Sequence, residues 1–227
     1  MWRIRILHIL WIIPIAWIDA IRIRKQPFST KFYAIQKWTQ LFFQCMHIQI
    51  EVQFKQELTN NQAVLFVSNH QSAFDIPLLL AILPIPFTFV SKKENKNIPF
   101  VGTCSKTLEL IFFDRNDQKS AVQMLRESAR WLKEDKSLLI FPEGTRAKQR
   151  SLLEMHAGSI QPARMTKTSI VPVVLYNSYD YKKILQGKAV AKVKVLEPIS
   201  FDAYKNEKAE SLIKKIQEKM QAELEKS

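Results

Sequence analysis

Short apolar runs that end in polar, turn-forming residues recur along this chain. Runs of this length and composition are typical of buried β-strands. Residues 48–54 differ, because apolar and polar side chains alternate strictly there, which predicts a half-buried strand. The apolar runs predict further strands near 63–68, 87–91, 109–113, 137–141, 169–175 and 190–196.

Between these strands the sequence predicts helices, near 73–83, 97–106, 117–134 and 155–165, followed by a charged amphipathic helix near 203–225. Asp117 is suited to cap the third of them. Regular alternation of strands and helices predicts an α/β fold, with a single, largely parallel mixed sheet flanked by helices. Ligands of such sheets bind beyond the carboxyl ends of the strands.

The N-terminal region has a different pattern. Residues 6–18 form a run of thirteen residues that is apolar except for His8, whereas a spanning helix needs about 20. Flanking arginines and three tryptophans favour a helix embedded in one leaflet over a buried soluble helix. Residues 28–46 carry an apolar stripe at helical spacing, which indicates core packing or a second membrane-resting arm. We therefore predict an N-terminal helical membrane anchor over 1–46 and an α/β domain over 47–227.

Charge narrows the classes of partner. The 227 residues include 34 basic and 21 acidic side chains, for a net charge of +13, which implies a nucleic acid, an anionic membrane or an acidic protein. No nucleic-acid-binding motif is present, so we expect no nucleic-acid partner. Two cysteines and four scattered histidines make neither a disulfide framework nor a metal pattern. The sequence thus predicts no metal and a reducing, cytosol-facing location.

The candidate chemistry begins where the 63–67 run ends. His70 follows that run, and Asp75 opens the next predicted helix. The intervening turn can bring Asp75 back onto one ring nitrogen of His70 and leave the other free to take a proton. These are two members of a Ser-His-Asp triad, but no Gly-x-Ser-x-Gly segment supplies the third. The pair therefore predicts a general base acting on a substrate hydroxyl; the alternative is a histidine that only supports the turn.

A second polar turn follows the apolar run near 137–141. There Gly144 permits close approach of the backbone to a ligand, and Arg146 offers donors suited to phosphate. Glu143 is predicted to orient Arg146 or to accept a hydrogen bond from a substrate hydroxyl. A surface turn with a solvated salt bridge is the alternative. His70, Arg115 and residues 143–146 all follow apolar runs that are predicted to be strands, so we expect them at one edge of the sheet. For Arg115, the alternative is a place in a surface turn.

Taken together, the motifs resemble those of the glycerolipid acyltransferase family, whose best-known members are the 1-acyl-glycerol-3-phosphate acyltransferases. The resemblance covers roughly residues 60 to 176. It departs from the family pattern at 95–97, at Thr103 and at 158–159. The blocks that carry it are NHQSAFD, FPEGTR about 70 residues later, and the segments 92–94, 98–102, 111–116 and 169–174.

The resemblance implies transfer of an acyl group from acyl-CoA or acyl-carrier protein, as co-substrate, to lysophosphatidic acid, giving phosphatidic acid without a cofactor. His70 is then the general base and Asp75 fixes its tautomer, while backbone amides after His70 are candidate oxyanion donors. The predicted substrate-binding residues are Arg115, Glu143, Gly144, Thr145 and Arg146. We expect the protein on the cytoplasmic face of the cell membrane, in contact with anionic lipid.

Other functions stay open at this stage. Glycerol 3-phosphate or another amphiphilic hydroxyl or amine is an alternative acceptor, and water at the same His–Asp pair would make the protein a hydrolase. A non-catalytic membrane lipid-binding protein is the alternative from a different class. Nucleic-acid binding rests on charge alone, and salt-sensitive binding to DNA but not to anionic vesicles would be its signature.

Overall fold

The computed structural model of the chain describes residues 2–58, 62–114 and 117–226. The strands are β1 Ile50–Phe54, β2 Val64–Ser68, β3 Phe87–Lys92, β4 Ile111–Phe113, β5 Ser137–Ile140, β6 Ser169–Leu175 and β7 Ala191–Val195. The helices are α1 Trp2–Arg22, α2 Phe28–Cys45, α3 Asp75–Ile82, α4 Pro99–Thr107, α5 Gln118–Lys133, α6 Gln161–Thr166, α7 Tyr181–Leu185, α8 Phe201–Tyr204 and α9 Ala209–Glu225.

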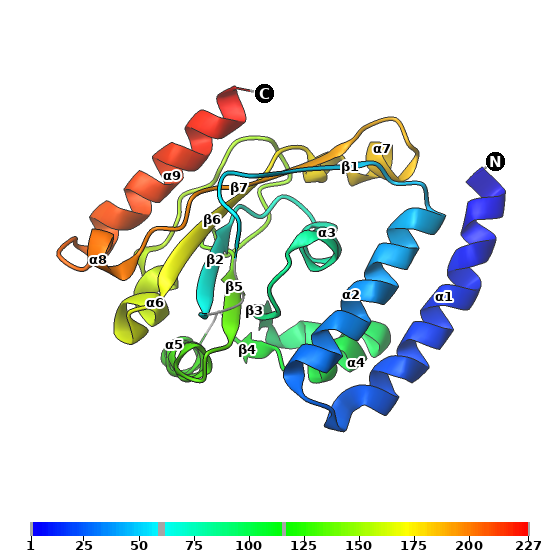
Figure 1. The fold of residues 1–227 in the computed structure, drawn as a ribbon, viewed down its shortest axis with the longest axis horizontal. Helices are drawn as coiled ribbons and strands as arrows, with labels where there is room; N and C mark the ends of the chain where they lie inside the picture. Colours follow the sequence, from blue (N-terminus) through cyan, green and yellow to red (C-terminus); the bar gives the residue numbers. More distant parts are fainter. Residues whose placement is uncertain (1, 59–61, 115–116, 227) are drawn as a thin grey trace.

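The described strands form one seven-stranded sheet in the order β1-β7-β6-β2-β5-β3-β4 (Figure 1). Five of them, from β6 to β4 in this order, run parallel to one another. Strand β7 is antiparallel to β6, and β1 at the edge is parallel to β7. The predicted α/β fold with a largely parallel mixed sheet is therefore confirmed.

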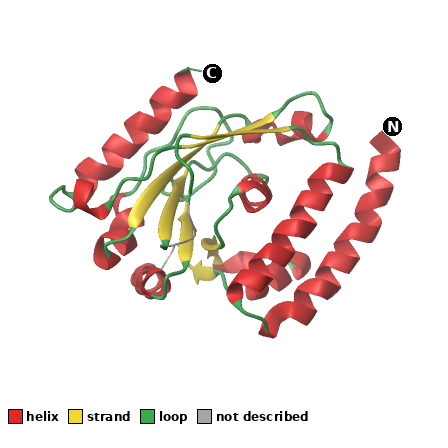
Figure 2. Cartoon of the chain, in the orientation of Figure 1, coloured by secondary structure: helices red, strands yellow, loops and turns green. Residues whose placement is uncertain are grey.

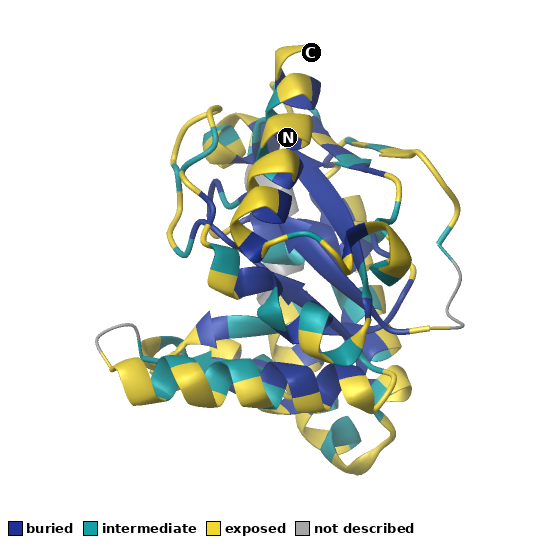
Figure 3. Ribbon diagram, turned by 90° about the vertical axis from the view of Figure 1, so that its left-hand side faces the viewer, coloured by how far each residue is buried: buried dark blue, intermediate teal, exposed yellow. Residues whose placement is uncertain are grey.

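Side chains on successive residues of the central strands enter two separate cores. Val64 and Phe66 pack with α2, α3 and α7 on one face of the sheet, whereas Leu65 and Val67 pack with α5, α6 and α9 on the other. This two-residue alternation is the geometry of any strand, and it explains why the central runs are apolar throughout. Helices thus cover both faces (Figure 2), and the central strands are the most buried part of the molecule (Figure 3).

Helix boundaries depart from the prediction more than strand positions do. Asp117 caps α5 as expected, its side chain accepting a hydrogen bond from the backbone N–H of Lys119 at 2.9 Å. The helix predicted near 155–165 is instead a 3-10 turn, Ala157–Ile160, followed by the short α6. The helix predicted near 203–225 is divided into α8 and α9, because buried Tyr204 docks its hydroxyl on the carbonyl of Thr168 before the chain turns. Helix α7 has no counterpart among the helices predicted from the sequence.

The N-terminal helices α1 and α2 lie side by side at one end of the molecule, opposite α9 (Figure 1). They share the hydrophobic core of the sheet, since Ala20, Phe32 and Phe43 belong to the same cluster as Phe66. Helix α1 is tied to α4 as well, through a hydrogen bond of 2.8 Å from the Trp17 indole to the Thr103 hydroxyl. The division of the chain at residues 46 and 47 stays a prediction.

From Trp11 onward, helix α1 buries its small side chains and exposes most of its large ones. Ala16 and Ala20 are buried, whereas Trp11 is 74% exposed and Ile15 and Ile18 are 49% and 51% exposed. A helix on the surface of a water-soluble protein normally has the reverse arrangement, with its large apolar residues facing the core. In the part of the chain that the structure describes, no helix has the length and hydropathy required to cross a bilayer.

Candidate active site

The loop after β2 holds a histidine against a carboxylate. His70 lies just beyond the end of β2, and Asp75 is the first residue of α3. The Nδ1 atom of His70 lies 2.7 Å from Oδ2 of Asp75. A carboxylate only accepts hydrogen bonds, so Nδ1 carries the proton in this contact, and the neutral ring keeps Nε2 as its basic atom. The structure therefore brings together the two residues that the sequence singles out.

Asp75 is fully buried, and its described partners all come from this loop. Its Oδ2 also accepts hydrogen bonds from the backbone N–H of Gln71 at 2.6 Å and of Ser72 at 2.9 Å. Its Oδ1 accepts a hydrogen bond from the hydroxyl of Ser72 at 3.2 Å. Asp75 occupies these two amides, so neither Gln71 nor Ser72 has a free N–H for a reacting oxyanion. The role of the other backbone amides in this turn stays a prediction.

A second loop, which follows β5, packs against His70. Strands β2 and β5 are neighbours and run parallel, so their carboxyl ends lie at one edge of the sheet, as expected. The ring of Phe141 stacks on the His70 ring, with 4.0 Å between centroids and 19° between planes. The backbone N–H of Ala147 donates to the carbonyl of His70 at 2.7 Å. The ring and the main chain of His70 are thus both held by the loop that carries the second motif.

Glu143 turns its carboxylate inward. The residue is only 4% exposed. Its Oε1 atom accepts a hydrogen bond from the backbone N–H of His70 at 2.7 Å, and its Oε2 atom accepts one from the backbone N–H of Leu153 at 2.9 Å. Burial raises the pKa of Glu143 to about 7; the negative charge of Asp75 adds to this rise, and the two N–H donors oppose it. These partners are backbone groups, not the guanidinium of Arg146 that the sequence suggested.

The next residues of the second motif face outward. Gly144 has a φ of +63°, in the left-handed region where glycine carries no steric penalty. The chain turns there, and the side chains of Thr145 and Arg146 are exposed directly before Ala147, which contacts His70. Arg115 lies outside the described residues, so the structure does not place it beside these groups.

Asn69, directly before His70, connects the His70 loop to another strand. Its side-chain amide donates to the carbonyl of Leu175 at 2.9 Å and accepts from the N–H of Leu175 at 2.8 Å. This reciprocal pair attaches the His70 loop to the end of β6. Only the presence of a polar residue directly after a buried strand hints at this role, because the partner lies 106 residues away in the sequence.

The Acyltransferase family model matches residues 49–176, which is more than half of the chain and includes both loops. The chain belongs to the Acyltransferase family.

Two relatives in this family are named 1-acyl-sn-glycerol-3-phosphate acyltransferase. The protein from Helicobacter pylori is 34% identical over 165 residues, which cover 71% of this chain and 68% of the relative. The protein from Saccharomyces cerevisiae is 29% identical over 190 residues, which cover 79% of this chain but only 62% of the relative. The region matched by this chain is thus less than two thirds of the length of several relatives.

The fold of the family is also seen in a solved structure. The crystal structure of the 1-acyl-sn-glycerophosphate (LPA) acyltransferase PlsC from Thermotoga maritima aligns with a TM-score of 0.72 at 22% sequence identity. The alignment covers 98% of this chain and 97% of that protein. The likeness therefore extends over the whole fold, including the N-terminal helices that the family model leaves out.

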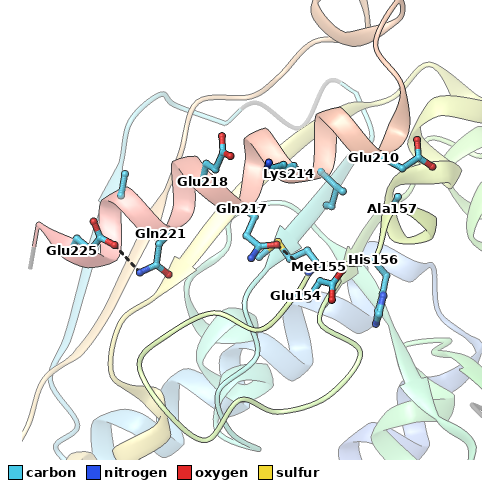
Figure 4. Close-up of a pocket in the computed structure, with 12 residues that line it drawn as sticks. Glu154, Met155, His156, Ala157, Glu210, Lys214, Gln217, Glu218, Gln221 and Glu225 are labelled. Carbon is cyan, nitrogen blue, oxygen red and sulfur yellow. Dashed lines mark hydrogen bonds between the residues drawn. The ribbon is translucent and has the colours of Figure 1, made fainter.

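A groove of about 730 Å³, which neither His70 nor Asp75 lines, lies between α9 and residues 154–157 (Figure 4). Most of the charged side chains that line it are carboxylates, with Lys214 as the amine among them. An acidic lining is a poor fit for a phosphate-bearing substrate, so we do not assign the groove to the reaction. Its carboxylates are Glu154, Glu210, Glu218 and Glu225.

Proposed function

We propose that the chain is an acyltransferase that moves a fatty acyl group from an acyl thioester to the sn-2 hydroxyl of 1-acyl-glycerol 3-phosphate, giving phosphatidic acid. The observation that carries the proposal is the His70–Asp75 pair, whose 2.7 Å contact leaves Nε2 as the basic ring atom. The sequence has no Gly-x-Ser-x-Gly segment to supply a nucleophile of its own. The names of the relatives support the choice of acceptor.

The proposed step is a direct transfer between two bound substrates. Nε2 of His70 takes the proton of the acceptor hydroxyl while the hydroxyl oxygen bonds to the thioester carbonyl carbon. The tetrahedral intermediate then collapses, the carbon–sulfur bond breaks, and the proton on Nε2 passes to the departing thiolate. Asp75 holds the ring and stabilises the imidazolium between these events. General-base catalysis of this kind typically contributes a factor of about 10² to 10⁴.

The acceptor phosphate is assigned to Arg146, with Arg115, Gly144 and Thr145 as further predicted binding residues. Arg146 is exposed on the loop whose next residue donates a hydrogen bond to the His70 carbonyl. A planar guanidinium binds phosphate oxygens in pairs, and so fixes the direction in which the rest of the molecule extends. Placing the hydroxyl near Nε2 is a large part of catalysis when two substrates must meet.

The donor is either acyl-CoA or acyl-carrier protein. Both are anionic, and the net charge of +13 suits either one. The thioester is already an activated acyl group, so the proposed reaction requires no cofactor.

We assign the exposed face of α1 to an anionic membrane at the cytoplasmic side of the cell. Trp11, Ile15 and Ile18 project on this face, whereas the alanines on the other side pack on the protein. Such a helix lies in the interface with its apolar face in the lipid. Basic residues close to the cytoplasmic leaflet add about 1 kcal/mol each. This placement would bring the active-site domain to the surface that holds its amphiphilic acceptor.

The proposal is tested with purified protein in detergent and an acyl thioester, by following thiol release. Lysophosphatidic acid, glycerol 3-phosphate or no acceptor is added in parallel, with acyl-CoA and acyl-carrier protein as alternative donors. We expect release only with lysophosphatidic acid, and its loss in His70→Ala. The matched control is His47→Asn, at an exposed histidine whose left-handed backbone suits asparagine.

Any other outcome of the thiol-release assay would point to a different function. Thiol release that depends on glycerol 3-phosphate would mean that the protein adds the first acyl chain to the glycerol, not the second. Release without any acceptor would identify a thioester hydrolase. Vesicle binding without release from either donor would support a lipid-binding protein and refute the proposed transfer.

A further inference from the structure

Both carboxylate oxygens of Glu143 are used by the protein itself. Oε1 bonds to the backbone N–H of His70 at 2.7 Å, and Oε2 bonds to that of Leu153 at 2.9 Å. The residue is 4% exposed, so its carboxylate has little surface with which to touch a bound substrate. A side chain that binds a substrate hydroxyl would have at least one oxygen directed toward the open side of the site.

The contact with His70 is one half of a clamp on a single residue. The loop after β5 holds the N–H of His70 through Glu143 and its carbonyl through the N–H of Ala147 at 2.7 Å. The next carbonyl, that of Gln71, accepts a hydrogen bond from Lys148 at 3.2 Å. The loop after β5 therefore fixes the main chain of His70, and the ring is held by Asp75 together with the stacked ring of Phe141.

The contact with Leu153 closes the loop that carries Arg146. Glu143 and Leu153 lie at the two ends of that loop, and their hydrogen bond holds the ends together. A second closure lies beside it, where the N–H of His156 donates to the carbonyl of Pro142 at 3.0 Å. Among these contacts, the Glu143 side chain is thus the group that bonds both to His70 and to Leu153, at the far end of the loop that carries Arg146.

We propose that Glu143 is a positioning residue, which fixes the distance between the basic Nε2 of His70 and the phosphate-binding side chain of Arg146. This inference rests on the proposed function and gives Glu143 a different part from substrate binding. With the clamp intact, an acceptor held by its phosphate at Arg146 meets the base at one set distance. Without Glu143, fewer hydrogen bonds join the two loops, so their relative position is less closely fixed and the hydroxyl reaches Nε2 in a smaller fraction of bound complexes.

A carboxylate is required because both partners are N–H donors. Glutamine at this position has one oxygen and one NH₂ group, so it satisfies one donor and sets N–H against N–H at the other. Aspartate keeps the charge but is one methylene shorter, and it reaches one backbone group at a time. Both substitutions retain a polar side chain of similar volume, so they weaken the clamp without opening a large cavity.

The first test compares steady-state kinetics of Glu143→Gln and Glu143→Asp with those of Arg146→Ala. We expect the Glu143 variants to lose about 10- to 100-fold in kcat, with the KM for lysophosphatidic acid nearly unchanged. Arg146→Ala is expected to raise that KM instead. A Glu143→Gln enzyme with wild-type kcat and a raised KM would assign the carboxylate to substrate and overturn the proposal. A loss of activity that only follows the fraction of unfolded protein would overturn it as well.

The second test does not depend on activity. Amide hydrogen exchange at His70 and Leu153, measured by NMR without substrate, directly reports the two hydrogen bonds that Glu143 accepts. We expect faster exchange in Glu143→Gln at the amide that the glutamine oxygen does not reach, and no change at either amide in Arg146→Ala. Unchanged exchange would refute the clamp. If the wild-type protein transferred no acyl group to any acceptor, the proposed function would fail, while this measurement would still decide whether Glu143 braces His70.

Discussion

Asp75 accepts four hydrogen bonds, from the His70 ring, two backbone amides and the Ser72 hydroxyl. Asparagine at this position would turn an NH₂ group toward donors that now meet an oxygen. We expect Asp75→Asn to fold but to lose about 10² to 10⁴ in kcat, because the ring tautomer is no longer fixed. Asp202→Asn, at an exposed carboxylate on α8, is the matched control. Wild-type kcat in Asp75→Asn would remove Asp75 from the mechanism.

Glu143 makes stability depend on pH in a direction unlike that of a surface carboxylate. Burial raises its pKa from 4.5 to about 7. Between these values the folded protein keeps a proton that the unfolded chain releases, so the free energy of unfolding falls as pH rises. The stabilising contribution is complete below pH 4.5 and is lost as pH rises through about 7.

Denaturant unfolding of the wild type and of Glu143→Gln between pH 5 and 8 measures this effect. Glutamine does not titrate, so we expect the wild type to lose on the order of 2 to 3 kcal/mol relative to the variant across that range. The nearby charge of Asp75 acts in the same direction as burial. A difference between the two proteins that stays constant with pH would show that the carboxyl group does not titrate there.

At the scale of residues, the sequence predicts the contact between His70 and Asp75 but does not predict the hydrogen bonds of Glu143 that hold His70 in place. His70 and Asp75 lie five residues apart, so a local turn was enough to predict their contact. The partners of Glu143 are the amides of His70 and Leu153, the first of them 73 residues away in the sequence. No local pattern shows whether a carboxylate after a strand points outward to a ligand or inward to such amides.

At the scale of elements, α1 offers a direct test of membrane contact. We expect the triple substitution Trp11→Glu, Ile15→Glu and Ile18→Glu to weaken binding to anionic vesicles by roughly 100-fold, since transfer of three large apolar side chains to lipid is lost. The buried face with Ala16 and Ala20 is untouched, so the fold is expected to persist.

The control for this triple variant is Val122→Glu, Met165→Glu and Tyr179→Glu. These residues are also exposed and apolar, but they lie on other elements. Vesicle flotation measures both proteins under the same conditions. Equal binding by the two variants would mean that the exposed face of α1 does not contact lipid.

Strands were easier to predict than helices for a physical reason. A central strand is buried on both faces, so its sequence is a continuous apolar run wherever it lies in the sheet. The breaks between α8 and α9 and before α6 depend instead on tertiary docking, such as that of Tyr204 on Thr168. These contacts leave no periodic signal in the sequence.

At the scale of the whole molecule, the charge of +13 predicts a salt-dependent attachment to anionic surfaces. Salt at about 1 M reduces the Debye length to about 3 Å and removes most of this attraction. We expect the wild type to keep a weaker, salt-resistant binding due to α1, and the triple Glu variant to lose binding altogether in high salt. Flotation across a salt series checks this, and wild-type binding that salt abolishes completely would exclude an apolar component.

The hydrogen bond between Trp17 and Thr103 has a consequence for biosynthesis. Thr103 follows Trp17 by 86 residues, so a ribosome that has released α1 and α2 has yet to make α4, the other helix against which α1 packs. If the proposed membrane contact is correct, lipid covers the exposed apolar face of α1 during this interval. The α/β sheet would then assemble on a chain already held at the membrane surface.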